Sequence, residues 1–325
     1  MSRTLEVELV ASISTVSPLG GAIVVATDGT HDSDGAVRVG IAIGRRDGVN
    51  AALLSVVEPF SFMEPETAGS PSEAERLTRL AIEAREGELA AQRSRTHPGR
   101  KSWPFSIHVG HRIDEIVSYA EHHAASLIVL GLGSHGAIAR LLQRETALRV
   151  IRAARTPVLA VPPDAWGVPH SVIVAIDFSP SSEEAARAAR DLLGGEGTLY
   201  LTHVKPRITI PQGDSRPWGE PAVTEVLGRL EELARRLDPP PGVSVEFVSL
   251  CGEPAQELVA LAEQHRVDMV ATGAHGRSPL GRLVLGSVST KVVRQAHCWV
   301  LVVPNRAVQT DEGEPADAPN APSVA

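Results

Sequence analysis

The second half of this chain repeats the first. Residues 110–162 align with residues 252–304 without a gap, at an offset of 142 residues. Within this stretch the apolar run Leu127–Gly131 falls on Met269–Gly273. Self-similarity over so long a stretch fixes the architecture before any local pattern is considered. It predicts two copies of one fold rather than one large domain.

The repeat continues upstream with one interruption. The apolar run that ends at Asp28 resembles the run that ends at Asp177, and these two aspartates lie 149 residues apart. The larger offset places seven extra residues in the first half, between its second strand and Gly110. Residues 58–102 hold them and are the variable part, and residues 72–95 carry the charges of a solvated helix.

Short apolar and β-branched runs alternate with segments of helical period in each half. This alternation is typical of βαβ units around a parallel sheet, and runs so apolar should be buried on both faces of that sheet. The sequence therefore predicts an α/β fold of two tandem doubly wound domains, each with a five-stranded parallel sheet and four helices. The expected strands are Ala22–Asp28, Ala51–Val57, Phe105–Gly110, Leu127–Gly131 and Pro157–Val161, then Ser171–Asp177, Thr198–Val204, Ser244–Leu250, Asp268–Gly273 and Trp299–Val303.

Prolines mark the boundary between the two expected domains. Pro162, Pro163 and Pro169 stand where neither a helix nor a central strand can continue. We therefore expect an N-terminal domain at residues 19–163 and a C-terminal domain at residues 167–304. Residues 305–325 contain almost nothing apolar, so a disordered tail is expected there.

Composition narrows the class of protein. The 325 residues carry 31 Lys and Arg against 39 Asp and Glu, a net charge of −8, which predicts binding neither to nucleic acid nor to an anionic membrane. No apolar stretch is long enough to cross a bilayer, and residues 1–18 lack the pattern of a secretion signal. Two separated cysteines, Cys251 and Cys298, do not make a disulfide scaffold. The expectation is a soluble protein of the reducing cytoplasm.

One glycine-rich loop carries the strongest functional signal. Gly273, Gly276 and the pair Gly286-Ser287 follow an apolar run and lead into a helical segment. Glycines let a backbone approach a ligand closely, and the start of a helix adds unpaired N–H groups and a partial positive charge. A loop of this kind suits phosphate, and Ser289 adds a second hydroxyl near the start of the helix.

The spacing Gly-x2-Gly-x9-Gly-Ser resembles the nucleotide loop of the universal stress protein family, and the resemblance covers nearly all of residues 167–304. It implies an adenine nucleotide alpha hydrolase-like fold and an ATP site, with or without Mg²⁺. In the family, Asp177 and the backbone at Val204 would contact the adenosine part, the loop would hold ribose and phosphates, and Arg277 would add charge. The residues assigned to the nucleotide are Asp177, Val204, Gly273, Gly276, Arg277, Gly286, Ser287, Val288 and Ser289.

The first half departs from this pattern in its own loop. On the ungapped alignment Gly276 becomes Ser134, and the pair Gly286-Ser287 becomes Arg144-Glu145. A glutamate there would repel phosphate, and larger side chains would crowd the loop. Asp28 and Gly131 are kept, so the sequence predicts a preserved fold that binds no ATP, or binds some ligand weakly.

The favoured function is a stress-response protein that binds ATP in its C-terminal half. The chain has neither a Cys-x2-Cys pair nor a His-Glu-x2-His helix, so we predict no resident metal site, and we identify no catalytic residue. Two alternatives stay open: a slow ATP hydrolase using Asp177 and Mg²⁺, and a nucleotide-free interaction protein.

The expected assembly follows from the repeat. The halves resemble two subunits of a dimer, so they should pack together as a pseudo-dimer through their last strands, Val158–Val161 and Val300–Val303. A homodimer of whole chains and an unidentified protein partner are both open.

Overall fold

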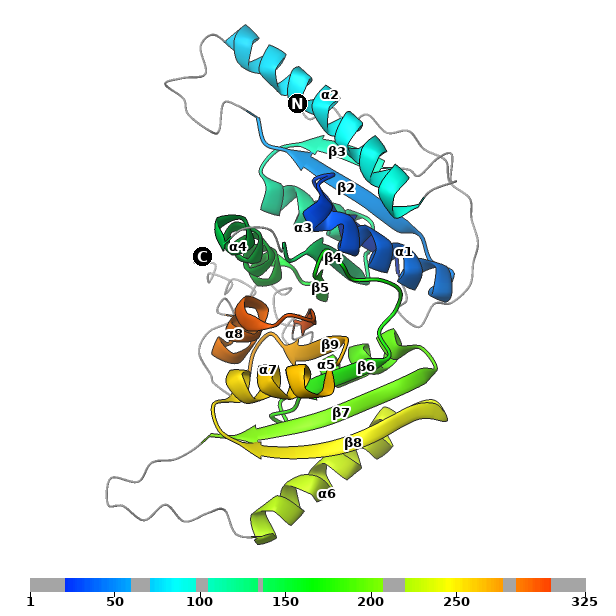
Figure 1. Cartoon of the computed structure of the whole chain (residues 1–325), viewed down its shortest axis with the longest axis vertical. Helices are drawn as coiled ribbons and strands as arrows, with labels where there is room; N and C mark the ends of the chain where they lie inside the picture. The colour runs from blue at the N-terminus through cyan, green and yellow to red at the C-terminus, as the bar shows by residue number, and fades with distance from the viewer. Residues whose placement is uncertain are drawn as a thin grey trace, which may run out of the picture.

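The ten strands form one continuous sheet that runs through both halves (Figure 1). The computed structural model describes residues 21–59, 71–97, 105–133, 137–206, 220–276 and 285–304. The first half contributes β1 (Ile23–Ala26), β2 (Ala51–Val57), β3 (Phe105–Val109), β4 (Leu127–Gly131) and β5 (Val158–Val161). The second contributes β6 (Ser171–Ala175), β7 (Glu196–Lys205), β8 (Gly242–Cys251), β9 (Met269–Gly273) and β10 (Trp299–Val303).

Strand order shows the repeat in three dimensions. The order across the sheet is β3-β2-β1-β4-β5-β10-β9-β6-β7-β8, so the two halves are related by reversal about the centre. Neighbouring strands within each half are parallel. This is the doubly wound arrangement that the sequence predicts.

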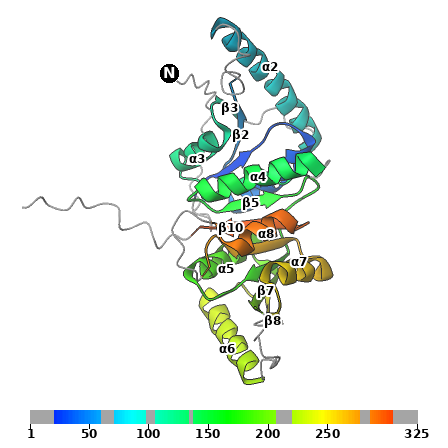
Figure 2. The same ribbon diagram turned by 90° about the vertical axis from the view of Figure 1, so that its left-hand side faces the viewer.

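The halves join where β5 meets β10, which we call the seam. The two strands pair antiparallel, with Leu301 opposite Leu159 and Val302 opposite Val158. Figure 2 shows them side by side at the middle of the molecule, with α4 and α8 next to each other across the seam. The predicted contact between the last strands is confirmed.

Helices cover both faces of the sheet. The helices of the first half are α1 (Asp34–Asp47), α2 (Pro71–Thr96), α3 (Arg112–His122) and α4 (Ala137–Ala153), with a short 3-10 turn η1 (His31–Ser33). Those of the second are α5 (Pro180–Leu193), α6 (Glu220–Leu237), α7 (Pro254–His265) and α8 (Ser287–Gln295). Buried side chains of α1, α5 and α6 form one core, and those of α3, α4, α7 and α8 form the other. Each core therefore spans the seam.

Burial falls off at the two ends of the sheet. The inner strands β1, β4, β5, β9 and β10 are almost wholly buried. The edge strand β3 exposes Phe105 and Val109, and β8 is exposed or half-buried at every position except Val243. The expected burial on both faces is thus wrong for the edge strands, each of which has a neighbouring strand on one side only.

Candidate functional site

The structure brings four predicted residues of the second half together beyond the ends of β6 and β9. Gly276 lies against Asp177, since a Cβ on Gly276 would come within 2.9 Å of Asp177 Oδ2. Gly286 lies beside the same turn, and a Cβ on it would be 3.9 Å from the nitrogen of Gly276. Gly273 packs so tightly on Ser181 of α5 that any side chain would collide. We call this edge of the second half the C-terminal crevice, after the place outside the carboxyl ends of the strands where open α/β sheets hold ligands.

Asp177 is held by the start of helix α5. The backbone N–H and the hydroxyl of Ser179 both donate to Asp177 Oδ1, at 3.0 and 2.5 Å. Ser179 also caps α5 by accepting from the N–H of Ser182, and Pro180 occupies the first turn. The carboxylate is therefore fixed at the end of the strand by the same residues that begin the helix.

Phe178, the residue after Asp177, belongs to the site although the sequence does not predict it there. Phe178 has φ +62°, a left-handed conformation that non-glycine residues adopt only when their surroundings compel it. The guanidinium carbon of Arg229 lies 3.7 Å from the centre of its ring, and the His203 ring lies 5.1 Å from it. These contacts from α6 and β7 hold Phe178 beside Asp177. No sequence pattern signals a positive φ at a phenylalanine.

The start of α8 presents backbone donors. Gly286 is its N-cap, with φ −57° and ψ 148°, and no side chain caps it. The N–H groups of Ser287, Val288 and Ser289 open the first turn, where no carbonyl of the helix can accept from them. Ser287 is exposed, whereas Ser289 is buried and its hydroxyl donates to the carbonyl of Gly273 at 2.7 Å. Ser289 thus ties the helix to the end of β9.

Of the two remaining predicted residues, the structure describes Val204 but not Arg277. Val204 lies near the end of β7, half-buried and paired with Leu250 of β8. The neighbouring strand β6 ends at Ala175, and the N–H of the next residue, Ile176, donates to the carbonyl of Thr202 on β7. Because β6 and β7 are parallel, Val204 and Asp177 lie at the same edge of the sheet, where these strands end. Arg277 lies outside the described residues.

The corresponding loop of the first half is partly helical. Helix α4 already contains Arg144 and Glu145, the counterparts of Gly286 and Ser287. Arg144 is buried and donates to the carbonyls of Arg294 and Ala296 at the far end of α8. Glu145 pairs with Arg294 at 2.6 Å. The expectation that these two side chains crowd a loop is wrong, because both lie in α4. They contact α8 instead and so join the two halves. Ser134 lies outside the described residues.

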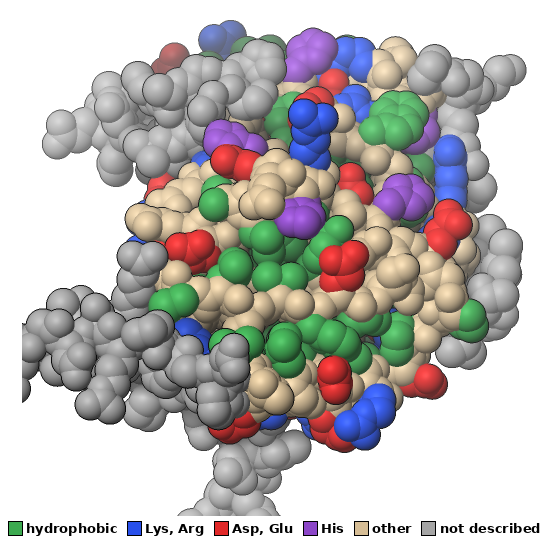
Figure 3. Space-filling model, turned by 60° about the horizontal axis from the view of Figure 1, so that its bottom comes forward, with side chains coloured by type: hydrophobic (Ala, Val, Ile, Leu, Met, Phe, Trp, Pro, Cys, Tyr) green, Lys and Arg blue, Asp and Glu red, His purple; other side chains and the backbone are tan. Residues whose placement is uncertain are grey.

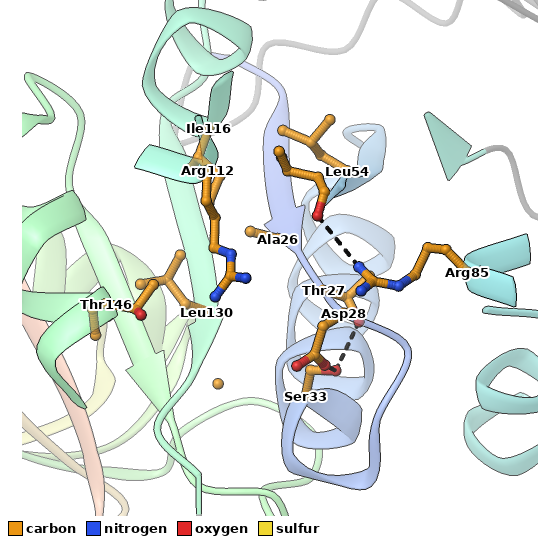
Figure 4. A pocket seen from close by; sticks show the side chains of 13 residues that line it. Ala26, Thr27, Asp28, Ser33, Leu54, Arg85, Arg112, Ile116, Leu130 and Thr146 are labelled. Carbon is orange, nitrogen blue, oxygen red and sulfur yellow. Dashed lines mark hydrogen bonds between the residues drawn. The ribbon is translucent and has the colours of Figure 1, made fainter. Parts of the chain in front are cut away.

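The first half nevertheless keeps a cleft at the same place in the fold, which we call the N-terminal cleft. It has a cavity volume of about 80 Å³. Figure 4 shows Arg112 of α3 reaching into it opposite Asp28 and Ser33, with Thr146 of α4 at its side. The lining residues are Ala26, Thr27, Asp28, Ser33, Leu54, Val56, Arg85, Arg112, Ile116, Leu130, Gly131, Thr146 and Ala147.

Asp28 in this cleft is a stabilised carboxylate. Burial raises its pKa, but hydrogen bonds from Thr30 and Ser33 and the charge of Arg85 outweigh burial, so the pKa lies below its ordinary value. Thr30 and Ser33 donate to Asp28 Oδ1 at distances of 2.7 to 3.1 Å. The aspartate of the first half is therefore ionised at neutral pH.

Within the described ranges, His, Cys, Asp and Glu side chains form no group of three or more that could hold a metal ion. No helix in the described part of the chain combines the length and apolar character needed to cross a bilayer. On the face in Figure 3, acidic and basic side chains of the described residues are interspersed with hydrophobic ones.

Comparison with known proteins identifies the family. The model of the universal stress protein family matches residues 21–162 and again residues 169–304. Universal stress proteins Rv2005c of Mycobacterium tuberculosis and Mb2028c of Mycobacterium bovis are each 29% identical over 292 residues, covering 86% of this chain and 96% of theirs.

A solved structure supports the same fold. The crystal structure of a universal stress protein from Archaeoglobus fulgidus superposes with a TM-score of 0.57 at 20% identity, over 87% of this chain and 98% of that one. At this identity the likeness concerns the fold alone. With two successive family matches that together span most of the sequence, the chain belongs to the universal stress protein family.

Proposed function

We propose that this protein binds ATP in the C-terminal crevice as part of a stress response. One observation carries the proposal: Asp177, Gly276 and Gly286 meet at the open first turn of α8. A carboxylate and a helix N-terminus at the same edge of a parallel sheet can accept from a sugar or base and donate to phosphate. Residues 19–163 and 167–304 would be the two domains.

The parts of the crevice suit different parts of the nucleotide. Asp177 would accept hydrogen bonds from the adenosine part, next to the backbone of Val204. The N–H groups of Ser287, Val288 and Ser289 would donate to phosphate oxygens, with Gly273, Gly276 and Gly286 giving the backbone room and Arg277 adding charge. Mg²⁺ would enter with the nucleotide, held chiefly by its phosphates.

The proposed role is binding rather than rapid chemistry. Slow ATP hydrolysis would need a carboxylate to position water or Mg²⁺, and Asp177 is the candidate. ATP turnover above background that Asp177→Ala abolishes would favour the hydrolase. The free cysteines Cys251 and Cys298 accord with the reducing cytoplasm, where we place the protein.

Isothermal titration with ATP and Mg²⁺ tests the site. The double variant Gly286→Arg/Ser287→Glu gives the second half the residues of the first, and it should abolish binding because it places a carboxylate at the phosphate position. A matched control, Gly228→Arg/Ser94→Glu, adds the same side chains at exposed helical positions far along the chain. The control should bind one ATP per chain as the wild type does.

Two results would contradict this proposal. Wild-type protein that gives no heat with ATP and carries no co-purified nucleotide would favour the interaction protein. Equal binding by the double variant and the wild type would place the nucleotide elsewhere. Thermal melting followed by circular dichroism shows whether each variant is folded.

A further inference from the structure

The N-terminal cleft is built differently from the C-terminal crevice. Gly29 follows Asp28 where Phe178 follows Asp177, and both residues are left-handed, with φ +78° and +62°. At Gly29 the backbone of α2 packs so closely that a Cβ would lie 2.7 Å from Glu88 Cβ. In the second half the Phe178 ring stands between its backbone and Arg229 of α6. Because Gly29 has no ring, α2 packs directly on the turn that follows Asp28.

Close packing of α2 brings a cation into the cleft. Arg85 precedes Glu88 by about one turn, and its Nη1 donates to Ser55 Oγ at 2.8 Å on β2. Its Nε donates to Glu88 at 2.9 Å. These hydrogen bonds fix the Arg85 side chain in the lining of the N-terminal cleft.

The size and walls of the cavity favour a compact ligand. About 80 Å³ holds several water molecules, at roughly 15 Å³ each, but is well below the roughly 300–1,000 Å³ of pockets for larger ligands. Leu54, Ile116 and Leu130 give the cavity an apolar surface. A molecule of a few carbons matches this volume.

Two charged side chains, Arg112 and Asp28, lie on opposite sides of the cavity. Arg112 faces the cleft, and its guanidinium pairs with Glu58 at 3.5 Å, with the two side chains 47% and 33% exposed. Such pairs are weak, so a carboxylate of the ligand can replace Glu58 on the guanidinium fork. Glu58 also accepts from the backbone N–H of Arg112 at 3.3 Å, a contact that can remain when the guanidinium turns to a ligand. Asp28 on the other side is an ionised acceptor that suits a hydroxyl or ammonium group.

We propose that the N-terminal cleft is a second binding site, for a small α-hydroxy or α-amino carboxylic acid. Its carboxylate would bind Arg112, its hydroxyl or ammonium group would donate to Asp28, and its short aliphatic part would contact Leu54, Ile116 and Leu130. The two halves of the chain then recognise ligands of different classes.

Ligand-observed NMR on the full-length protein, with lactate and L-valine as probes, tests this site. Saturable binding of at least one probe is expected, weakened about tenfold or more by Arg112→Gln and by Asp28→Asn, since each removes a charge-assisted hydrogen bond. Arg149→Gln, an exposed position on α4, should bind as the wild type does. The samples contain no nucleotide, so the result does not depend on ATP binding.

Three results would overturn the site. Neither probe binds; or both cleft variants bind as the wild type does; or inorganic phosphate binds as tightly as the acids and depends on Arg112 alone, which would make the cleft a site for charge only. Arg112 is half-exposed, so Arg112→Gln should remain folded. If Asp28→Asn does not fold, Arg112→Glu supplies the second variant and should abolish binding.

Discussion

One position, directly after the strand-end aspartate, distinguishes the two halves at the scale of single residues. A left-handed phenylalanine costs about 1–3 kcal/mol of backbone strain. The contact of Arg229 with the Phe178 ring returns roughly 0.5–2 kcal/mol, so the strain is largely offset. Gly29 has the same backbone conformation without steric cost. The left-handed turn is therefore kept in both halves by different means.

Gly29→Ala should lower the free energy of unfolding by about 1–3 kcal/mol, because its Cβ would be strained and would press on Glu88. Gly228→Ala should do the opposite and raise it by roughly 0.5–1 kcal/mol, since Gly228 is an exposed helical glycine with open space around it. Urea unfolding of the two variants measures both values. An unchanged or raised free energy of unfolding for Gly29→Ala would show that the turn after Asp28 tolerates a side chain.

At the scale of elements, α4 and α8 differ in where they begin. Residues 137–153 include neither glycine nor proline, whereas residues 277–286 include Pro279, Gly281 and Gly286. Helix propensity therefore favours an early start for α4. Its first turns carry Arg144, which satisfies carbonyls at the end of α8 that the helix itself leaves unpaired.

Arg144→Met should lower the free energy of unfolding by about 1–3 kcal/mol, because it removes the hydrogen bonds that Arg144 donates to the carbonyls of Arg294 and Ala296. Hydrogen exchange should also accelerate in residues 287–296 more than in β1 or β4. Arg149→Met, on the exposed side of the same helix, is the control and should change little. Unchanged exchange in α8 would show that Arg144 does not hold its end.

The sequence predicts the elements better than it predicts the site. All ten strands lie where apolar runs predict them, since a run such as Ala51–Val57 can be buried in few other ways. The helical start of α4 could have been read from the missing glycines at 137–145. The conformation of Phe178 and the position of Arg85 in the N-terminal cleft could not, because both depend on packing between distant segments.

The whole molecule is one body across its seam. Leu159 and Leu301 face each other in β5 and β10 and share one core, while their neighbours in the same strands belong to the other. Neither half can lose this contact without exposing apolar surface of both. Folding should therefore be cooperative over both halves rather than independent in each.

Differential scanning calorimetry tests this cooperativity. The wild type should show one transition, and Leu301→Ala should move that single transition to lower temperature, at a cost of about 2–5 kcal/mol for the lost buried volume. Val223→Ala, at an exposed position of α6, should leave the transition nearly in place. Two separate peaks in either protein would mean that the halves unfold independently.

Helix α8 reaches from the C-terminal crevice to the edge of the N-terminal cleft. Its first turn opens on the C-terminal crevice, and its last carbonyls accept from Arg144, two residues before Thr146 in the wall of the N-terminal cleft. Nine residues of helix span only about 13 Å. If a ligand in one of the two proposed sites displaces this helix and so changes the affinity of the other site, the second ligand must change the affinity of the first by the same factor. Through the seam, the two proposed sites of the tandem repeat would then form a thermodynamically coupled pair.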